Sequence, residues 1–215
     1  VMDIHHIVAD GLSMGILKRE LADCYVSRQL PQLPARYIDY AVWQHNGRES
    51  SGIAAQKAYW LKRFPGEIPV LNLPLDAPRP ASQSFEGALV SFALEPATAA
   101  ALIDLAQQRG FTTFTVVLSV FYILLSRLSG QEDIVTGTPT AGRRYVELEG
   151  IIGMFVNTLA LRAFPSGERS VVQFLEEVSA DTFEAFDNQD YQFEDLVEHL
   201  ALPRDTGRNP LFDVM

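Results

Sequence analysis

The sequence predicts an α/β protein with two lobes. Strand-like and helical segments alternate along its 215 residues, which is typical of α/β architecture. Hydrophobic residues make up 47% of the chain and charged residues 20%, so the chain is long and apolar enough to bury a core. Five prolines fall between residues 65 and 80. That density excludes a helix and favours an extended connector between the lobes.

Residues 1–64 are predicted to form part of an N-terminal lobe. Its expected elements are a strand at 1–8, a loop at 9–12, and helices at 13–28, 38–45 and 53–64. Ser13 is a suitable N-cap for the first helix. One face of that helix carries apolar side chains and is predicted to be buried; it consists of Leu17, Leu21, Cys24 and Tyr25.

Residues 65–87 are the predicted connector, and residues 88–215 are predicted to form part of a C-terminal lobe. In that lobe the pattern indicates strands at 88–94, 133–138 and 154–163, and helices at 97–108, 113–128 and 170–186. The apolar stretch 114–125 is too short to span a bilayer, so it is expected to be a buried core helix.

Charge and cysteine content narrow the function classes. The net charge of −10 argues against a nucleic-acid partner, because phosphate binding needs clustered lysine and arginine. The sequence indicates no membrane partner and no signal peptide. Cys24 is the only cysteine, which excludes an intrachain disulfide and favours a cytoplasmic location. Both ends run into apolar segments, so we expect an internal segment of a longer polypeptide.

The run from His5 to Gly11 is the most informative local feature. It places His5 and His6 four residues from the start, with Asp10 and Gly11 just beyond. Imidazole titrates near neutral pH and is the usual side chain for moving protons. In a strand, neighbouring side chains point to opposite faces, so one histidine can face a cavity while the other packs behind it. The residues alone leave catalysis and simple packing equally open.

Two other chemistries are possible at this run. A metal site would need a third ligand from a distant residue such as His45 or His199, and we expect none. The segment Gly11–Gly15 also fits the G-x-S-x-G nucleophile elbow of a serine hydrolase, with Ser13 as nucleophile and with Asp187 or Asp190 and then His199 following in the chain. This remains an alternative function.

Polar and aromatic residues elsewhere carry weaker signals. The side chains of Tyr37, Tyr40 and Trp43, spaced by three, are expected to form a core-facing helical stripe. Asn157 is polar inside an apolar strand and therefore needs hydrogen-bond partners. Residues 188–190 are expected to form a turn after an acidic helix.

Five segments in this order resemble the condensation domain of nonribosomal peptide synthetases, within the chloramphenicol-acetyltransferase-like superfamily. The segments are His5-His6-x-x-x-Asp10-Gly11, Tyr37–Gln44, Ile152–Thr158, Asn188–Glu194, and Arg204-Asp205-x-x-Arg208-Asn209-Pro210-Leu211-Phe212. The resemblance implies two chloramphenicol-acetyltransferase-like lobes around a tunnel, incomplete at both ends of this chain. It also implies an acyltransferase that forms a peptide bond.

The resemblance further implies partners and residue roles. The partners are upstream and downstream peptidyl carrier domains, whose phosphopantetheine arms deliver the substrates, and an adjacent adenylation domain; no cofactor is bound by the chain itself. His6 is implied to face the tunnel, His5 to support it, Asp10 to be a structural carboxylate, and Gly11 to keep the backbone close to the reacting groups. Tunnel or structural roles fall to Asn157, Gln189, Asp190, Arg208 and Asn209.

Three further expectations follow from the comparison with that family. The family's arginine partner of the aspartate lies upstream, so Asp10 is expected to lack a partner within this chain. The isolated chain is expected to be inactive, and an inactive carrier-binding fragment is the remaining alternative. Residues 10–15 and 151–158 favour a donor of L configuration.

Overall fold

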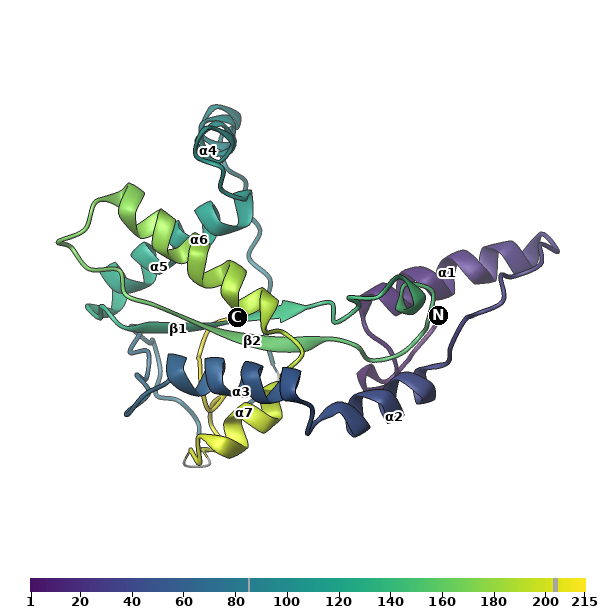
Figure 1. The fold of residues 1–215 in the computed structure, drawn as a ribbon. Coiled ribbons are helices and arrows are strands. Elements are labelled where there is room, and N and C mark those ends of the chain that lie inside the picture. The colour runs from purple at the N-terminus through teal and green to yellow at the C-terminus, as the bar shows by residue number, and fades with distance from the viewer. Residues whose placement is uncertain (85, 203–204) are drawn as a thin grey trace.

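A two-stranded antiparallel sheet forms the centre of the fold in the computed structural model, which describes residues 1–84, 86–202 and 205–215. Its strands are β1 (Ile134–Thr140) and β2 (Asn157–Ala163), with Gly137 opposite Ala160. Four helices cover the sheet: α5 (Thr113–Ser129) and α6 (Val171–Asp187) on one face, and α3 (Ser51–Arg63) and α7 (Phe193–His199) on the other (Figure 1). The sheet therefore lies between two helical layers.

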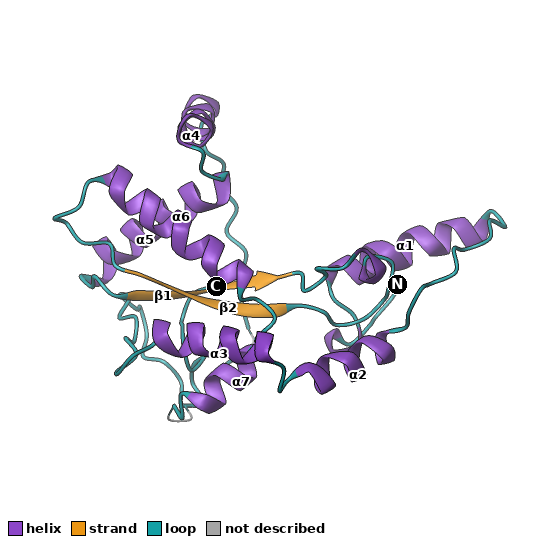
Figure 2. Cartoon of the chain, in the orientation of Figure 1, coloured by secondary structure: helices purple, strands orange, loops and turns teal. Residues whose placement is uncertain are grey.

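The remaining elements extend away from this sheet. They are η1 (His6–Val8), α1 (Gly11–Tyr25), α2 (Tyr37–Gly47), α4 (Pro96–Arg109) and η2 (Val146–Leu148). Figure 2 shows α1 and α2 at one end of the molecule, beside the long loop that joins β1 to β2. That loop is the part of the C-terminal sequence that reaches the N-terminal motif.

Apolar side chains fill both sides of the sheet. Below it, Trp60 and Phe64 of the α3 region pack with Leu159 and with residues 211–212. On the other side, Tyr122 of α5 packs with residues of β1 and α6. Burying one such side chain contributes roughly 1.5–3 kcal/mol, so these clusters hold the helices onto the strands.

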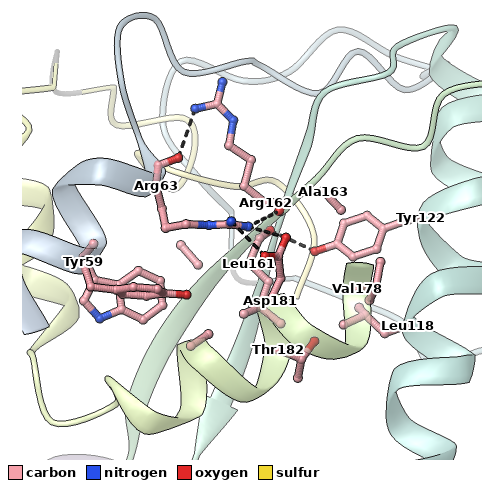
Figure 3. Close-up of a pocket in the computed structure, with 13 residues that line it drawn as sticks. Tyr59, Arg63, Leu118, Tyr122, Leu161, Arg162, Ala163, Val178, Asp181 and Thr182 are labelled. Carbon is pink, nitrogen blue, oxygen red and sulfur yellow. Dashed lines mark hydrogen bonds and ion pairs between the residues drawn. The ribbon is translucent and has the colours of Figure 1, made fainter. Parts of the chain in front are cut away.

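An ionic network joins α3, β2 and α6 (Figure 3). The Arg63 guanidinium donates to both carboxylate oxygens of Asp181, at 2.9 and 2.6 Å, and to the Arg162 carbonyl at 3.1 Å. Arg162 in turn binds Asp133 in a bidentate pair at 2.8 and 2.6 Å. The nearby Tyr122 hydroxyl donates to the Leu161 carbonyl. The small gap between these residues is about 10 Å³, so this region is structural packing.

Most predicted helices are confirmed, and local signals explain where they begin and end. Thr112 accepts a hydrogen bond from the amide of Thr115 and so caps α5, while the left-handed Gly130 ends it. Ser170 and Gln173 form a capping box at the start of α6. The strands predicted at 133–138 and 154–163 are also present, within one to three residues of their expected starts.

Two predicted strands are wrong. Residues 1–8 contain only the short 3₁₀ turn η1, and residues 88–94 form no strand and no helix. In that second segment Leu89, Val90 and Phe92 are more than four-fifths exposed. Alternation of apolar and polar residues produces a strand only when a neighbouring backbone accepts its hydrogen bonds.

The predicted buried face of α1 is also wrong. Only Ser13 and Ile16 are buried in this helix, whereas Leu21, Cys24 and Tyr25 are exposed, because α1 extends beyond the elements that could cover it. Helix α5 is buried on one face and about half-exposed on the other, at Val117, Val120 and Leu124 among others. Helix α7 was not predicted.

The predicted connector lacks regular secondary structure, as its proline content indicated. Its described residues, 65–84 and 86–87, contain no helix or strand. The division of the chain at residue 64 remains a prediction, and Trp60 and Phe64 pack in the same core as residues 211–212.

In the described part of the chain no single helix is long and apolar enough to cross a membrane; α4 and α5 meet the requirement only as a pair bent by 114°.

Candidate functional site

Asp10 is the centre of a buried polar cluster. Its side chain is 1% exposed and caps α1, with Oδ1 accepting hydrogen bonds from the Ser13 amide and hydroxyl at 2.7 Å each. Oδ2 accepts from the Phe155 amide at 3.2 Å. Burial raises the pKa of this carboxyl, but the bonds from Ser13 and Phe155 and the charge of Arg143 outweigh burial, and its pKa lies below the usual value.

Arg143, from the loop between the strands, forms an ion pair with Asp10. Its Nη2 lies 3.2 Å from both carboxylate oxygens, and its side chain is 4% exposed. Nη1 donates to the carbonyl oxygens of Leu148 and Ile151, and the guanidinium lies 4.0 Å from the centre of the Phe155 ring. The expectation that Asp10 lacks a partner within this chain is therefore wrong.

Ser13 bridges three segments and is not a nucleophile. Its side chain is fully buried, and its hydroxyl lies 2.8 Å from the Gly153 carbonyl while accepting from the Gly153 amide and Arg143 at 3.0 Å each. It occupies the third position of α1, so the N-cap role predicted for Ser13 belongs to Asp10. His199 contacts Tyr191 and the Asp195 carbonyl instead. The serine-hydrolase alternative is wrong because substrate cannot reach this hydroxyl.

The two histidines immediately precede this cluster and differ in their contacts. His5 caps the turn η1, where its Nδ1 accepts a hydrogen bond from the Ile7 amide at 3.1 Å. His6 lies within the turn, and within the described residues its side chain makes no hydrogen bond. Both are exposed, and the turn replaces the opposite strand faces that were predicted for them.

Gly11 begins α1, and an added Cβ there would meet no atom within 4 Å. The described residues therefore leave open space beside Gly11, and its predicted role of keeping the backbone close to the reacting groups remains a prediction. Among the described residues, no three His, Cys, Asp or Glu side chains gather as a metal ion would require.

A cavity of about 200 Å³ lies beside the Asp10 cluster. Its lining includes Asn157, Gln189 and Asp190, to which the family resemblance assigned tunnel or structural roles, together with Tyr40 and Phe155. Burial raises the pKa of Tyr40 to about 12, with a smaller effect of the Asp190 charge, so its hydroxyl keeps its proton at neutral pH. His5 and His6 are not among the described residues that line this cavity.

Asn157 fixes the turn that follows α6. Its Nδ2 donates to the carbonyls of Gln189 and Tyr191, at 2.8 and 2.9 Å. Its Oδ1 accepts from the amides of Thr158 and Phe193. Both polar atoms of its side chain are therefore engaged within the chain, and the choice between a tunnel and a structural role for Asn157 remains a prediction.

The turn residues are held from two further directions. Gln189 accepts a hydrogen bond from the Thr140 hydroxyl, and Asp190 pairs with Arg144 at 2.6 Å. Gln56 of α3 accepts from the amides of Asp190 and Tyr191 and donates to the Asp190 carboxylate. The turn is therefore rigidly attached to both α3 and the sheet.

The two predicted site residues of the C-terminal loop, Arg208 and Asn209, also lie outside this cavity. Arg208 is 3.7 Å from Asp213 and 3.8 Å from Asp205, and Asn209 accepts a hydrogen bond from the Leu211 amide. These contacts shape the C-terminal loop. Arg204, which belongs to the same sequence motif, lies outside the described residues.

Two of the residues that build this region were missed, namely Arg143 and Gln56, which lie 133 and 134 positions from their partners. Ser13 was noticed in the sequence, but only as a nucleophile or an N-cap and not as a bridge between segments. The aromatic stripe was only partly predicted. Tyr37 and Tyr40 pack on Phe155 at centroid distances of 5.1 and 4.7 Å, but Trp43 is 56% exposed. The Asp-x-x-Ser spacing was the available signal for a cap at Asp10.

The family model described as Condensation domain matches residues 1–215. Among curated proteins, the chain is 51% identical over all 215 residues to a subunit of plipastatin synthase from Bacillus subtilis (strain 168), of which it covers 8%. It is 49% identical, again over 215 residues, to gramicidin S synthase 2 of Brevibacillus brevis, of which it covers 5%. The chain therefore spans less than a tenth of the length of these relatives.

Solved structures that resemble the chain also come from nonribosomal peptide synthetases. The chain is similar to a holo four-domain nonribosomal peptide synthetase bound to AMP and glycine, with a TM-score of 0.87 and 28% identity, covering 97% of this chain and 16% of that one. It is also similar to the first condensation domain of the calcium-dependent antibiotic synthetase in complex with a substrate analogue, with a TM-score of 0.73 and 26% identity, covering 92% and 44%. These likenesses confirm the expected chloramphenicol-acetyltransferase-like α/β fold class. Since the family model spans its full length, the chain belongs to the condensation domain family of nonribosomal peptide synthetases.

Proposed function

We propose that the domain containing this chain forms peptide bonds in nonribosomal peptide biosynthesis. An upstream carrier presents an aminoacyl or peptidyl thioester, and the amine of an aminoacyl thioester on a downstream carrier attacks its carbonyl. A new amide forms, and the upstream carrier leaves as its thiol. Family membership and 51% identity to part of plipastatin synthase support this proposal.

The observation that carries the proposal is the contrast between a fixed Asp10 and an available His6. Asp10 is buried and bound by Ser13, Phe155 and Arg143, so the start of α1 is rigid. His6 lies four residues earlier, exposed and without a side-chain hydrogen bond in the described part of the chain. We assign His6 to the reacting groups, His5 to support of the turn, and Gly11 to backbone clearance there.

Positioning dominates catalysis in this proposal. An α-amino group has a pKa of about 8, so roughly a tenth is already neutral at pH 7. General-base help typically contributes ~10²–10⁴-fold, whereas orienting two tethered reactants contributes ~7–11 kcal/mol. His6 therefore orients the amine or stabilises the tetrahedral intermediate.

The partners follow from this reaction. They are two peptidyl carrier domains with phosphopantetheine arms and an adenylation domain in the same polypeptide; the chain itself binds no cofactor. The donor has L configuration, and Arg208 and Asn209 act structurally. The single cysteine, which excludes an intrachain disulfide, supports a cytoplasmic location.

Single-turnover condensation in the intact synthetase tests the assignment of His6. We expect His6→Ala to lower the single-turnover rate by about 10²–10³-fold, the loss typical of removing one group that stabilises a tetrahedral intermediate. His45→Ala, an exposed histidine near the end of α2, is the matched control and should retain the full rate. An unchanged rate in His6→Ala would remove His6 from the mechanism.

A further inference from the structure

The cavity beside the Asp10 cluster has an aromatic wall that the roles above do not use. Tyr40 and Phe155 have ring centroids 4.7 Å apart, and Tyr40 and Trp43 have centroids 5.9 Å apart. Trp43 meets Tyr145 edge to face at 5.6 Å. Phe155 is 3% exposed, whereas Trp43 and Tyr145 are 56% and 51% exposed. The wall therefore runs from a buried floor to an open mouth.

The polar groups of the cavity are largely occupied by other parts of the chain. Both side-chain ends of Gln56 bind residues 190–191, and both ends of Asn157 bind the backbone of the same turn. Gln189 binds the Thr140 hydroxyl and the Phe186 carbonyl. Asp190 is compensated by Arg144 at 2.6 Å. A charged guest would find few free partners here, whereas an apolar guest would leave these bonds intact.

We propose that this cavity receives the apolar side chain, aliphatic or aromatic, of a carrier-bound aminoacyl substrate. The proposal rests on the proposed function and adds a substrate class to it. The volume of about 200 Å³ is below the roughly 300–1,000 Å³ of pockets that hold drug-sized ligands, and it suits a single side chain. Both the donor and the acceptor substrate can carry an apolar side chain, and the experiment below distinguishes which of the two enters the cavity.

Phe155 connects the cavity to the cluster behind the histidines. Its ring lines the cavity and lies 4.0 Å from the Arg143 guanidinium carbon, while its amide donates to Asp10 at 3.2 Å. A side chain packed on this ring is therefore one residue away from the carboxylate that caps α1. This places substrate selection next to the rigid part of the candidate site.

Gly52 offers a way to fill the cavity without removing any of its contacts. It lines the cavity near the start of α3, and an added Cβ would meet only the Ser50 hydroxyl, at 4.0 Å. Leucine also favours a helix more than glycine does, so Gly52→Leu should fold. Ala101→Leu on the exposed surface of α4 is the control for adding an apolar side chain.

The test uses the intact synthetase, with glycine, leucine or phenylalanine loaded on the donor or on the acceptor carrier. We expect Gly52→Leu to lower kcat/KM for leucine and phenylalanine by ~10–100-fold on one of the two carriers, and to leave glycine within about twofold. Gly52→Ala should give a smaller loss of the same kind. Equal losses for glycine and phenylalanine, or no loss for either, would overturn the proposal.

Calorimetric titration separates this proposal from the proposed function. The probes are pantetheine amides of phenylalanine and glycine, which bind without reacting. Tighter binding of the phenylalanine amide to wild type, lost in Gly52→Leu, supports the pocket even if no peptide bond forms. Equal affinities of wild type and Gly52→Leu for the phenylalanine amide contradict the pocket even if condensation proceeds.

Discussion

Replacing Arg143 with methionine is expected to destabilise the fold strongly. The change leaves the Asp10 carboxylate 1% exposed without its cationic partner and removes the donor from two backbone carbonyls, Leu148 and Ile151. Breaking a buried ion pair from one side typically costs about 3–5 kcal/mol. Asp10 keeps three donors from Ser13 and Phe155, which favours the lower end, but the two carbonyls add to the cost. We expect a loss of about 3–5 kcal/mol.

Urea denaturation followed by tryptophan fluorescence measures this loss as a change in the free energy of unfolding. The matched control is Arg169→Met, which removes an arginine from an ion pair with Glu177 whose side chains are 40% and 47% exposed. Exposed pairs contribute about 0–1 kcal/mol. If Arg143→Met costs no more than Arg169→Met, the buried cluster does not stabilise the fold. The double variant Asp10→Asn/Arg143→Met should cost less than the sum of its single changes, since it leaves no uncompensated charge.

Three further outcomes are expected. Gly153→Ala would bring a Cβ into steric clash with the Tyr37 ring and should lower the free energy of unfolding by about 1–3 kcal/mol. Gly167→Ala, where an added Cβ meets no described atom within 4 Å, should change it by less than about 0.5 kcal/mol. Asn157→Ala leaves two turn carbonyls and two amides without partners and should cost at least about 3 kcal/mol in the same urea assay. Folding lowers the pKa of Asp10, so its ionised carboxylate stabilises the fold fully at pH values above the unfolded pKa of about 3.9, and this stabilisation disappears as the pH falls through the lower folded pKa. In Asp10→Asn, the free energy of unfolding should therefore depend less on pH between about pH 5 and 3 than it does in the wild type.

Helices could be predicted from the sequence because their signals are local. The apolar pattern and the caps around residues 113–128 lie within one segment, and the helix there begins and ends within one residue of the prediction. The strands predicted at 1–8 and 88–94 had the same kind of local signal, but a strand also needs a partner. The described part of the chain supplies none, so Leu89 and Phe92 remain exposed.

The candidate site, like the fold, could be predicted only where the signal lies within one short segment. The Asp10 motif and the polar Asn157 were evident in the sequence, since each stands out from its apolar neighbours. Their partners were not evident, because Arg143 lies 133 positions from Asp10 and the groups that bind the Asn157 side chain all belong to the backbone. No pattern in residue types marks which backbone carbonyl will face an amide.

The contacts of Asp10 also determine when the site can form during synthesis of the polypeptide. Phe155 lies 145 positions after Asp10, and Ser13 and Gly153 are separated by 140. At about 5–20 residues per second, the ribosome needs roughly 7 to 30 s to reach Phe155 after it has incorporated Asp10. During that interval the carboxylate is hydrated and the histidine turn lacks its support. The site is therefore assembled late, from two distant parts of the chain, and a translational pause before residue 155 would prolong the period in which Asp10 and the start of α1 are exposed.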